Sequence, residues 1–283
     1  MKQRLNDYLE LTKPRVTTLV VLTAWMGFSL GGGKSYSGLW WWVMLSTALT
    51  AGGASAINQY IERELDAKMR RTQNRPLPQK RLDPAHALAF GVLISIAGLV
   101  VLAGAVNLLT AFLATLSIAS YLFLYTPMKT RTALCTLVGA VPGAIPPMMG
   151  WTAVRGALAP QAWVLFAILF LWQLPHFLAI AWMYRDDYAR AGFPMLPVVD
   201  PEGGSTARMI ILYTAILIPV TLLPARMGLA GFSYFYGALG LGIAFLVCGA
   251  FTAFFRTPMY ARRLLLASVI YLPTLLTWMV LSA

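Results

Sequence analysis

The sequence contains little charge, and most of that charge has one sign. Charged residues make up only 11% of the 283 residues, whereas hydrophobic residues make up 59%, and the mean hydropathy is +0.69. This composition excludes an ordinary soluble domain and predicts several membrane-spanning helices. Ten acidic residues stand against 22 basic ones, which gives a net charge of +12.

Histidine and cysteine are also scarce. The only histidines are His86 and His176, and the only cysteines, Cys135 and Cys248, fall inside predicted spans without a C-x-x-C pattern. These few residues argue against a zinc site and against a disulfide framework. His86 follows Asp83-Pro84 at a predicted helix start, where a structural role is expected.

The long apolar runs predict an all-α, polytopic membrane protein with nine transmembrane helices. The runs cover residues 15–33, 38–60, 85–106, 109–126, 133–153, 160–183, 207–226, 229–253 and 264–282. Each run is long enough to cross about 30 Å of hydrocarbon. We treat residues 1–283 as a single integral membrane domain.

The basic residues are placed on one side of this predicted topology. Only Lys34, Arg155 and Arg226 lie on the other side, and all acidic residues share the basic side. The positive-inside rule therefore predicts a cytoplasmic N-terminus and a periplasmic C-terminus. Membrane topology and contact with anionic lipid explain the net charge, and no nucleic-acid partner is predicted. The polar N-terminal segment carries no signal or transit pattern, which favours a bacterial cell inner membrane.

Two long cytoplasmic loops, 58–85 and 184–208, are expected to carry the function. In the first, Asn58, Glu62 and Asp66 follow one another at intervals of four residues. Each interval on a helix rises about 6 Å and turns about 40° past a full circle, so their oxygens share one face. Such oxygens suit Mg²⁺, which usually takes one or two carboxylates together with phosphate oxygens and water.

Basic residues accompany these oxygens on the same side of the membrane. The first loop contains Arg63, Arg70, Arg71 and Arg75, whose guanidinium groups can hold phosphate in a bidentate manner. Lys129 and Arg131 end the fourth predicted span nearby and could serve either as topology anchors or as diphosphate ligands.

The second loop contains Asp186 and Asp187 between arginines. This pair could complete a second Mg²⁺ position or simply form a solvated face. His176 lies inside the sixth predicted span, where an ionisable residue is a functional candidate. A packing role for His176 is the alternative. Pro142, Pro146 and Pro147 predict a kinked fifth span that can widen a pocket for a lipid-like substrate.

These residues resemble the UbiA superfamily of intramembrane prenyltransferases. The resemblance rests on the N-x-x-x-(D/E)-x-x-x-D pattern from Asn58 to Asp66, on Tyr125-x-x-x-Lys129 and on a second aspartate loop. Further strings resemble the haem O synthase branch: residues 11–15 (LTKPR), 66–72 (DAKMRRT), 143–147 (GAIPP), 172–177 (WQLPHF) and 187–197 (DYARAGFPMLP).

The resemblance implies a bundle of nine helices around a central cavity that opens laterally to lipid. It implies that farnesyl diphosphate binds with its head group on Mg²⁺, and that its prenyl chain joins a vinyl group of haem B with addition of water. Asn58, Glu62, Asp66, Lys129 and Asp187 would then be catalytic.

The resemblance also assigns groups of binding residues. Diphosphate would contact Arg63, Arg70, Arg75, Lys129 and Arg131, the metal would contact Asn58, Glu62, Asp66, Asp186 and Asp187, and haem would contact His176. The product would pass to a haem A synthase or an oxidase assembly partner.

Two positions depart from the family pattern. Glu62 stands where aspartate is more usual, and Met183 replaces the first aspartate of a D-x-x-x-D motif, so the pattern does not decide between Asp186 and Asp187.

Two other functions are compatible with parts of the sequence. A UbiA-type enzyme that prenylates an aromatic quinone precursor would share the whole diphosphate apparatus. A transporter or lipid-binding protein would also contain intramembrane prolines and polar residues. Transport, however, predicts polar groups near the middle of the bilayer, whereas the charge here is concentrated at one face.

Overall fold

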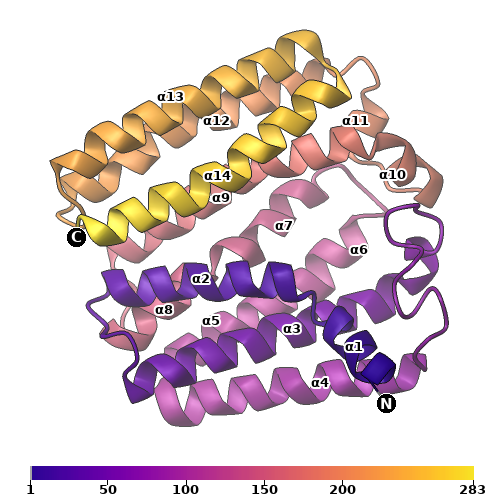
Figure 1. Ribbon diagram of the computed structural model, residues 1–283, viewed down its shortest axis with the longest axis horizontal. Coiled ribbons are helices and arrows are strands. Elements are labelled where there is room, and N and C mark those ends of the chain that lie inside the picture. Colours follow the sequence, from indigo (N-terminus) through magenta and orange to yellow (C-terminus); the bar gives the residue numbers. More distant parts are fainter. Residues whose placement is uncertain (1) are drawn as a thin grey trace.

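The protein forms a bundle of long helices that run side by side along its longest dimension (Figure 1). The computed structural model describes residues 2–283, and no β-strand occurs among them. The seven longest helices are α2 (Pro14–Leu30), α3 (Gly38–Asp66), α4 (Pro84–Val101), α9 (Pro160–Met183), α12 (Gly204–Arg226), α13 (Phe232–Phe255) and α14 (Pro258–Leu281). The predicted all-α class is confirmed.

Within residues 2–283, seven helical segments are long and apolar enough to cross a membrane. They are Pro84–Val106, Leu108–Met128, Cys135–Arg155, Pro160–Met183, Gly204–Arg226, Phe232–Phe255 and Pro258–Leu281. A polytopic protein is therefore confirmed, but the predicted count of nine spans is not. The two other predicted spans are α2 and α3. Helix α2 has only 17 residues, and the C-terminal part of α3 carries the polar stripe from Asn58 to Asp66.

Three of the spanning segments are irregular helices. Helix α4 continues into a π-helical turn, η1 (Leu102–Val106), and α5 (Leu108–Ala119) continues through the π-helical η2 (Ser120–Tyr125) into α6 (Thr126–Met128). The fifth predicted span divides into α7 (Cys135–Ala144) and α8 (Pro146–Arg155). Pro146 has no N–H and its ring clashes with the preceding turn, so the kink expected from the prolines is confirmed.

Glycines allow α2 and α8 to pack with their backbones in close contact. A Cβ atom at Gly27 of α2 would lie 1.9 Å from the carbonyl oxygen of Pro147, and a Cβ at Gly150 of α8 would lie 1.9 Å from that of Ala24. Small residues at helix crossings are the usual means of close packing in a membrane, where lipid competes with apolar side chains for the same surfaces. Helix α2 is thereby fixed along one wall of the bundle.

The short helices gather at one end of the bundle. Helices α1 (Lys2–Leu11), α10 (Arg185–Ala191) and α11 (Leu196–Val199) lie at this end together with the connection between α3 and α4, whereas the C-terminus lies at the opposite end (Figure 1). The two segments predicted as loops, 58–85 and 184–208, are partly helical, so their irregular parts are shorter than expected. Residues 58–66 belong to α3, and α10, α11 and the start of α12 lie within 184–208.

Helix α1 was not predicted. Its ten residues are mostly polar, so they contain no apolar run long enough to predict a membrane span. Its last turn is fixed by Gln59, whose side chain donates to the carbonyl oxygen of Leu11 at 2.9 Å. Arg81 contacts the carboxylate of Asp7 and donates to that of Glu10 at 2.9 Å. These contacts join α1 to α3 and to the connection after it.

Candidate active site

A cavity of about 510 Å³ lies in the middle of the bundle and is lined by side chains from α2, α3, α5, η2, α7, α9 and α14. The end nearest the short helices is lined by charged side chains: Lys13, Glu62, Asp66, Arg71, Arg75 and Lys129. Most of the remaining lining is apolar, including Met26, Ala54, Ile118, Met149, Leu169 and Leu276. The cavity therefore has a charged end and an apolar interior.

Helix α3 carries the oxygen stripe into the charged end. Asn58, Glu62 and Asp66 all line the cavity, and each is buried. The expectation that their spacing places them on one helix face is confirmed, because all three reach the same cavity.

Each of these three residues contacts a different cation. Lys13 Nζ donates to Asn58 Oδ1 at 3.1 Å, Lys129 Nζ contacts both Glu62 oxygens at 2.8 and 3.1 Å, and Arg75 Nη1 donates to Asp66 Oδ2 at 2.6 Å. The cations come from three separate segments of the chain. A buried carboxylate is costly unless it is paired, so these contacts hold the loops onto the end of α3.

The pairing also affects proton affinity at the charged end. Burial, together with the nearby cations Arg75 and Lys129, lowers the pKa of Lys13 to about 7. Burial opposes the charge of Lys129 as well, but Tyr125 and Glu62 outweigh it and raise the pKa of Lys129 well above its usual value. Lys129 is therefore a fixed positive charge at this end of the cavity.

The π-helical segment η2 contributes side chains to the cavity lining next to Lys129. Thr126 Oγ1 accepts from Asn58 Nδ2 at 3.1 Å and donates to the carbonyl oxygen of Tyr121 at 2.8 Å, a carbonyl that the widened turn leaves accessible. The rings of Tyr121 and Tyr125 stack with centroids 5.6 Å apart, and Lys129 Nζ lies 4.6 Å from the Tyr125 centroid. Two aromatic faces therefore border the junction between the charged end and the apolar interior.

The two adjacent aspartates of α10 occupy different environments. Asp187 is buried, accepts from the backbone N–H of Arg71 at 3.2 Å and contacts the guanidinium of Arg190. The side chain of Asp186 is 85% exposed. Of the two, Asp187 contacts the connection after α3, whereas the Asp186 side chain lies in solvent.

Three of the predicted diphosphate ligands do not line the cavity. The guanidinium of Arg63 lies 4.7 Å from the Tyr60 ring and donates to the Tyr60 carbonyl, while Arg70 and Arg131 are exposed. Arg63 follows Glu62 by one residue, which rotates it about 100° away from the stripe. Of the five predicted diphosphate ligands, the structure therefore brings Arg75 and Lys129 to the cavity and leaves the other three outside its lining.

Lys13 and Arg71 line the cavity in their place. Lys13 precedes Pro14, adopts a left-handed backbone with φ of +48°, and extends from the start of α2 to Asn58. Proline disfavours the right-handed helical conformation for the residue before it, so Lys13 lies outside the helix that begins at Pro14. The Lys-Pro pair directly before an apolar run was the available sequence signal.

The second of these cations, Arg71, lies against two aromatic rings. Its guanidinium carbon is 5.2 Å from the Tyr184 ring centroid and 5.8 Å from the Tyr188 ring centroid.

A polar group also lies in the apolar interior. His176, Trp172 and Gln173 of α9 all line the cavity. The His176 ring stacks on Trp172 with centroids 5.0 Å apart, and Gln173 Nε2 donates to the carbonyl oxygens of Leu169 and Ala140. The predicted intramembrane histidine therefore faces the cavity rather than lipid.

The cavity is open on one side of the bundle. Val16, Leu19 and Leu22 of α2 line the cavity and are also exposed, and so is Val269 of α14. Apolar residues that belong to both surfaces mark an opening between α2 and α14 toward the surrounding lipid. The lateral opening implied by the resemblance is present.

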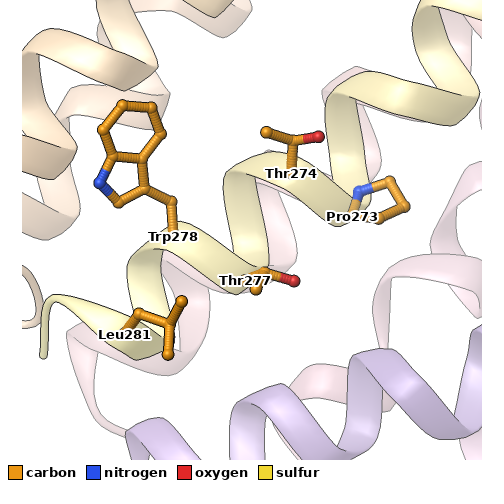
Figure 2. A pocket seen from close by; sticks show the side chains of 5 residues that line it. All are labelled: Pro273, Thr274, Thr277, Trp278 and Leu281. Atoms are coloured by element: carbon orange, nitrogen blue, oxygen red, sulfur yellow. The ribbon is translucent and has the colours of Figure 1, made fainter.

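Figure 2 shows a second hollow, on the surface of α14, lined by Pro273, Thr274, Thr277, Trp278 and Leu281. It contains no ionisable side chain, and the Thr274 hydroxyl already donates to the carbonyl oxygen of Ile270 at 2.8 Å. This hollow lacks the groups that chemistry requires, so the candidate active site is the central cavity.

Comparisons with known proteins place the chain in a family. Residues 20–280 match the UbiA prenyltransferase family. The chain belongs to this family. It is 51% identical to the protoheme IX farnesyltransferase of Solibacter usitatus, over 98% of this chain and 99% of that protein. It is 48% identical to the protoheme IX farnesyltransferase of Koribacter versatilis, over 98% of this chain and 93% of that one.

Solved structures of lower sequence identity share the fold. A digeranylgeranylglyceryl phosphate synthase superposes with a TM-score of 0.82 at 16% identity, covering 99% of this chain and 98% of that one. A UbiA homologue from Archaeoglobus fulgidus bound to DMAPP and Mg²⁺ superposes with a TM-score of 0.66 at 15% identity, covering 96% and 99%. The UbiA-type bundle is thus established for this chain.

Proposed function

We propose that this protein transfers the farnesyl group of farnesyl diphosphate to a vinyl group of haem B, with addition of water, to give haem O and diphosphate. The main support is the near full-length similarity to proteins named protoheme IX farnesyltransferase. The cavity agrees with these substrates, because it joins a charged end for a diphosphate to an apolar interior for a prenyl chain.

The charged end suits a diphosphate because its cations are already in position. Lys13, Arg75 and Lys129 each contact one oxygen-bearing side chain of α3, and Arg71 stands beside them in the cavity lining. These cations would stabilise the negative charge that develops on the leaving diphosphate as the carbon–oxygen bond breaks. Arg75 and Arg71 can hold phosphate oxygens in a bidentate manner.

The oxygens of α3 fit a divalent cation that is shared with the substrate. In residues 2–283, no three His, Cys, Asp or Glu side chains form a metal cage by themselves. Two carboxylates and an amide oxygen on one face, without a full cage, fit the way proteins hold Mg²⁺ together with phosphate oxygens. We propose that Asn58, Glu62 and Asp66 hold Mg²⁺ in this manner, with Asp187 as a supporting carboxylate. When bound, Mg²⁺ would neutralise charge on the departing diphosphate.

The interior must protect an allylic cation and orient a weak nucleophile. The Tyr121 and Tyr125 rings present π-faces near the junction, where they can stabilise positive charge while the apolar walls exclude water. Bond formation at the vinyl group leaves a cation on the carbon next to the porphyrin ring. Water adds to this carbon and loses a proton, which gives the hydroxyethylfarnesyl side chain. We propose that His176 contacts haem, because it is the histidine that faces this interior.

We further propose that the protein resides in a bacterial cell inner membrane with its charged end in the cytoplasm. The uneven distribution of lysine and arginine supports this orientation. Haem O would then pass to a haem A synthase or to an oxidase under assembly.

An acceptor competition assay tests this function. Purified protein in detergent receives farnesyl diphosphate, Mg²⁺, haem B and 4-hydroxybenzoate in equal amounts, and both acceptors are followed by mass spectrometry. Farnesylation of haem B alone is expected. Farnesylation of 4-hydroxybenzoate alone would keep the diphosphate chemistry and overturn the proposed acceptor.

A further inference from the structure

Ser268 of α14 makes a contact that the reaction outlined above does not use. It is fully buried, and its hydroxyl lies between two partners. Ser268 Oγ lies 2.6 Å from the carbonyl oxygen of Leu265 in its own helix and 2.7 Å from Nδ1 of His176 on α9. The backbone carbonyl of Ser268 also accepts from Trp172 Nε1 at 2.9 Å. One residue of α14 therefore contacts two neighbouring rings of α9, those of Trp172 and His176.

The two hydroxyl contacts determine which nitrogen of His176 carries the proton. A serine hydroxyl has one hydrogen, and a carbonyl oxygen can only accept. The hydrogen therefore points to Leu265, and Ser268 Oγ must accept from Nδ1–H. If Nδ1 carried no proton, one of the two short contacts would bring two acceptors together.

The second nitrogen of His176 is consequently the acceptor that faces the cavity. Within residues 2–283, Nε2 makes no hydrogen bond, and no carboxylate contacts the ring to stabilise a charged imidazole. A neutral imidazole with its proton on Nδ1 presents a lone pair at Nε2. This form cannot donate to a haem propionate, but it can bind a metal.

We propose that Ser268 is a positioning residue that holds His176 as the Nδ1–H tautomer, so that Nε2 serves as an axial ligand of the haem iron in the substrate. The inference rests on the proposed function, since it takes haem as the acceptor. It goes further by choosing iron ligation over propionate binding and by assigning a residue outside α9. Metal-bound histidines commonly donate their other ring N–H to a neighbouring group, which fixes the orientation of the ring.

Stacking on Trp172 reinforces the same orientation. With its ring held on one side by the indole and at Nδ1 by Ser268, His176 has little rotational freedom. Ser268 is also adjacent in sequence to Val269, and Val269 lines the opening between α2 and α14. A porphyrin that enters from lipid would meet Nε2 without any need for the ring to reorient.

Titration of ferric haem B into the detergent-solubilised full chain tests the proposal, with absorption and electron paramagnetic resonance spectra as readouts. The wild type is expected to show histidine ligation, and His176→Ala is expected to lose it. Ser268→Ala should bind haem about tenfold more weakly with a mixed ligation spectrum, as is typical when the partner of a metal-bound histidine is removed. Ser268→Thr keeps the hydroxyl and should restore the wild-type spectrum.

Thr214→Ala is the matched control. Thr214 is buried in α12 and donates to its own helix at the carbonyl of Ile210, 2.7 Å away, without contact to a histidine. Its haem affinity and spectrum should equal those of the wild type. An unchanged affinity and spectrum in Ser268→Ala would overturn the positioning role, and identical spectra for wild type and His176→Ala would overturn iron ligation. Turnover of haem B by the wild type is measured in parallel, so that failure of the proposed function is recognised separately.

Discussion

The two ends of the cavity are constructed on different principles. At the charged end, each oxygen-bearing side chain of α3 contacts a cation from another segment, and the contacts connect α3 with residue 13, the 67–83 connection and residue 129. In the interior, polar atoms are few and are fixed by neutral hydrogen bonds between two helices, as at His176 and Ser268. Charge pairing organises the first region and helix packing organises the second.

In the proposed reaction, the charged end would act on the leaving group and the interior would select the acceptor. Under the proposed function, the charged end would accept any prenyl diphosphate, because its cations and oxygens would contact only the phosphates and the metal ion. The interior would then determine which acceptor lies next to the reacting carbon. Substitutions at one end should therefore affect diphosphate and metal dependence, and substitutions at the other should affect haem binding.

The largest effect is expected at Asp66. Asp66→Ala removes a proposed Mg²⁺ ligand and leaves Arg75 without its partner, so turnover should fall at least about a hundredfold, within the range found when charge stabilisation is removed from a transition state. Steady-state turnover as a function of Mg²⁺ concentration measures the change. Glu64→Ala is the control, because the Glu64 side chain is 82% exposed and lies outside the cavity. Substantial Mg²⁺-dependent activity in Asp66→Ala would contradict the metal site.

A second effect concerns the stability of the charged end. Lys129→Met leaves the buried carboxylate of Glu62 unpaired and should destabilise the protein by about 3 kcal/mol. The double variant Lys129→Met/Glu62→Leu removes both charges and should recover most of that stability. Thermal unfolding in detergent compares the two. Equal loss in both variants would show that the ion pair does not hold this end together.

His176→Ala should produce a smaller and selective effect. Haem affinity should fall at least as far as in Ser268→Ala, by about tenfold or more, since the proposed iron ligand itself is removed. The affinity for farnesyl diphosphate should stay the same, because His176 makes no contact with the charged residues around α3. Titrations with each substrate separate these quantities. A parallel loss of diphosphate affinity would show that the two ends are coupled.

The smallest effect is expected at Asp186. Asp186→Asn changes an exposed carboxylate and should leave turnover within about twofold of wild type, as is usual for surface changes. Asp187→Asn should weaken the contact to the Arg71 backbone and lower turnover markedly. Turnover at saturating Mg²⁺ measures both. A larger loss in the Asp186 variant would reverse the assignment of the two aspartates.

Much of the architecture was predictable because hydropathy and helical spacing are local properties. The interval of four residues placed Asn58, Glu62 and Asp66 on one face, and the prolines marked the break between α7 and α8. The cations were harder to assign. Residue type and position nominated Arg63, Arg70, Arg75, Lys129 and Arg131 equally, but which of these cations faces the cavity depends on how the connections fold back over α3. Lys13 reaches the site through a left-handed residue before a proline, and Ser268 reaches it through packing of α14 on α9. Such long-range contacts leave no periodic signal in the sequence.

The most direct test of the central claim uses haem B and farnesyl diphosphate with purified protein, in the presence and absence of Mg²⁺, followed by mass spectrometry of the extracted pigment. The proposed function predicts a Mg²⁺-dependent pigment that has gained one farnesyl group and one hydroxyl group, with release of diphosphate. Haem that remains unchanged under conditions in which the protein binds both substrates would contradict the claim.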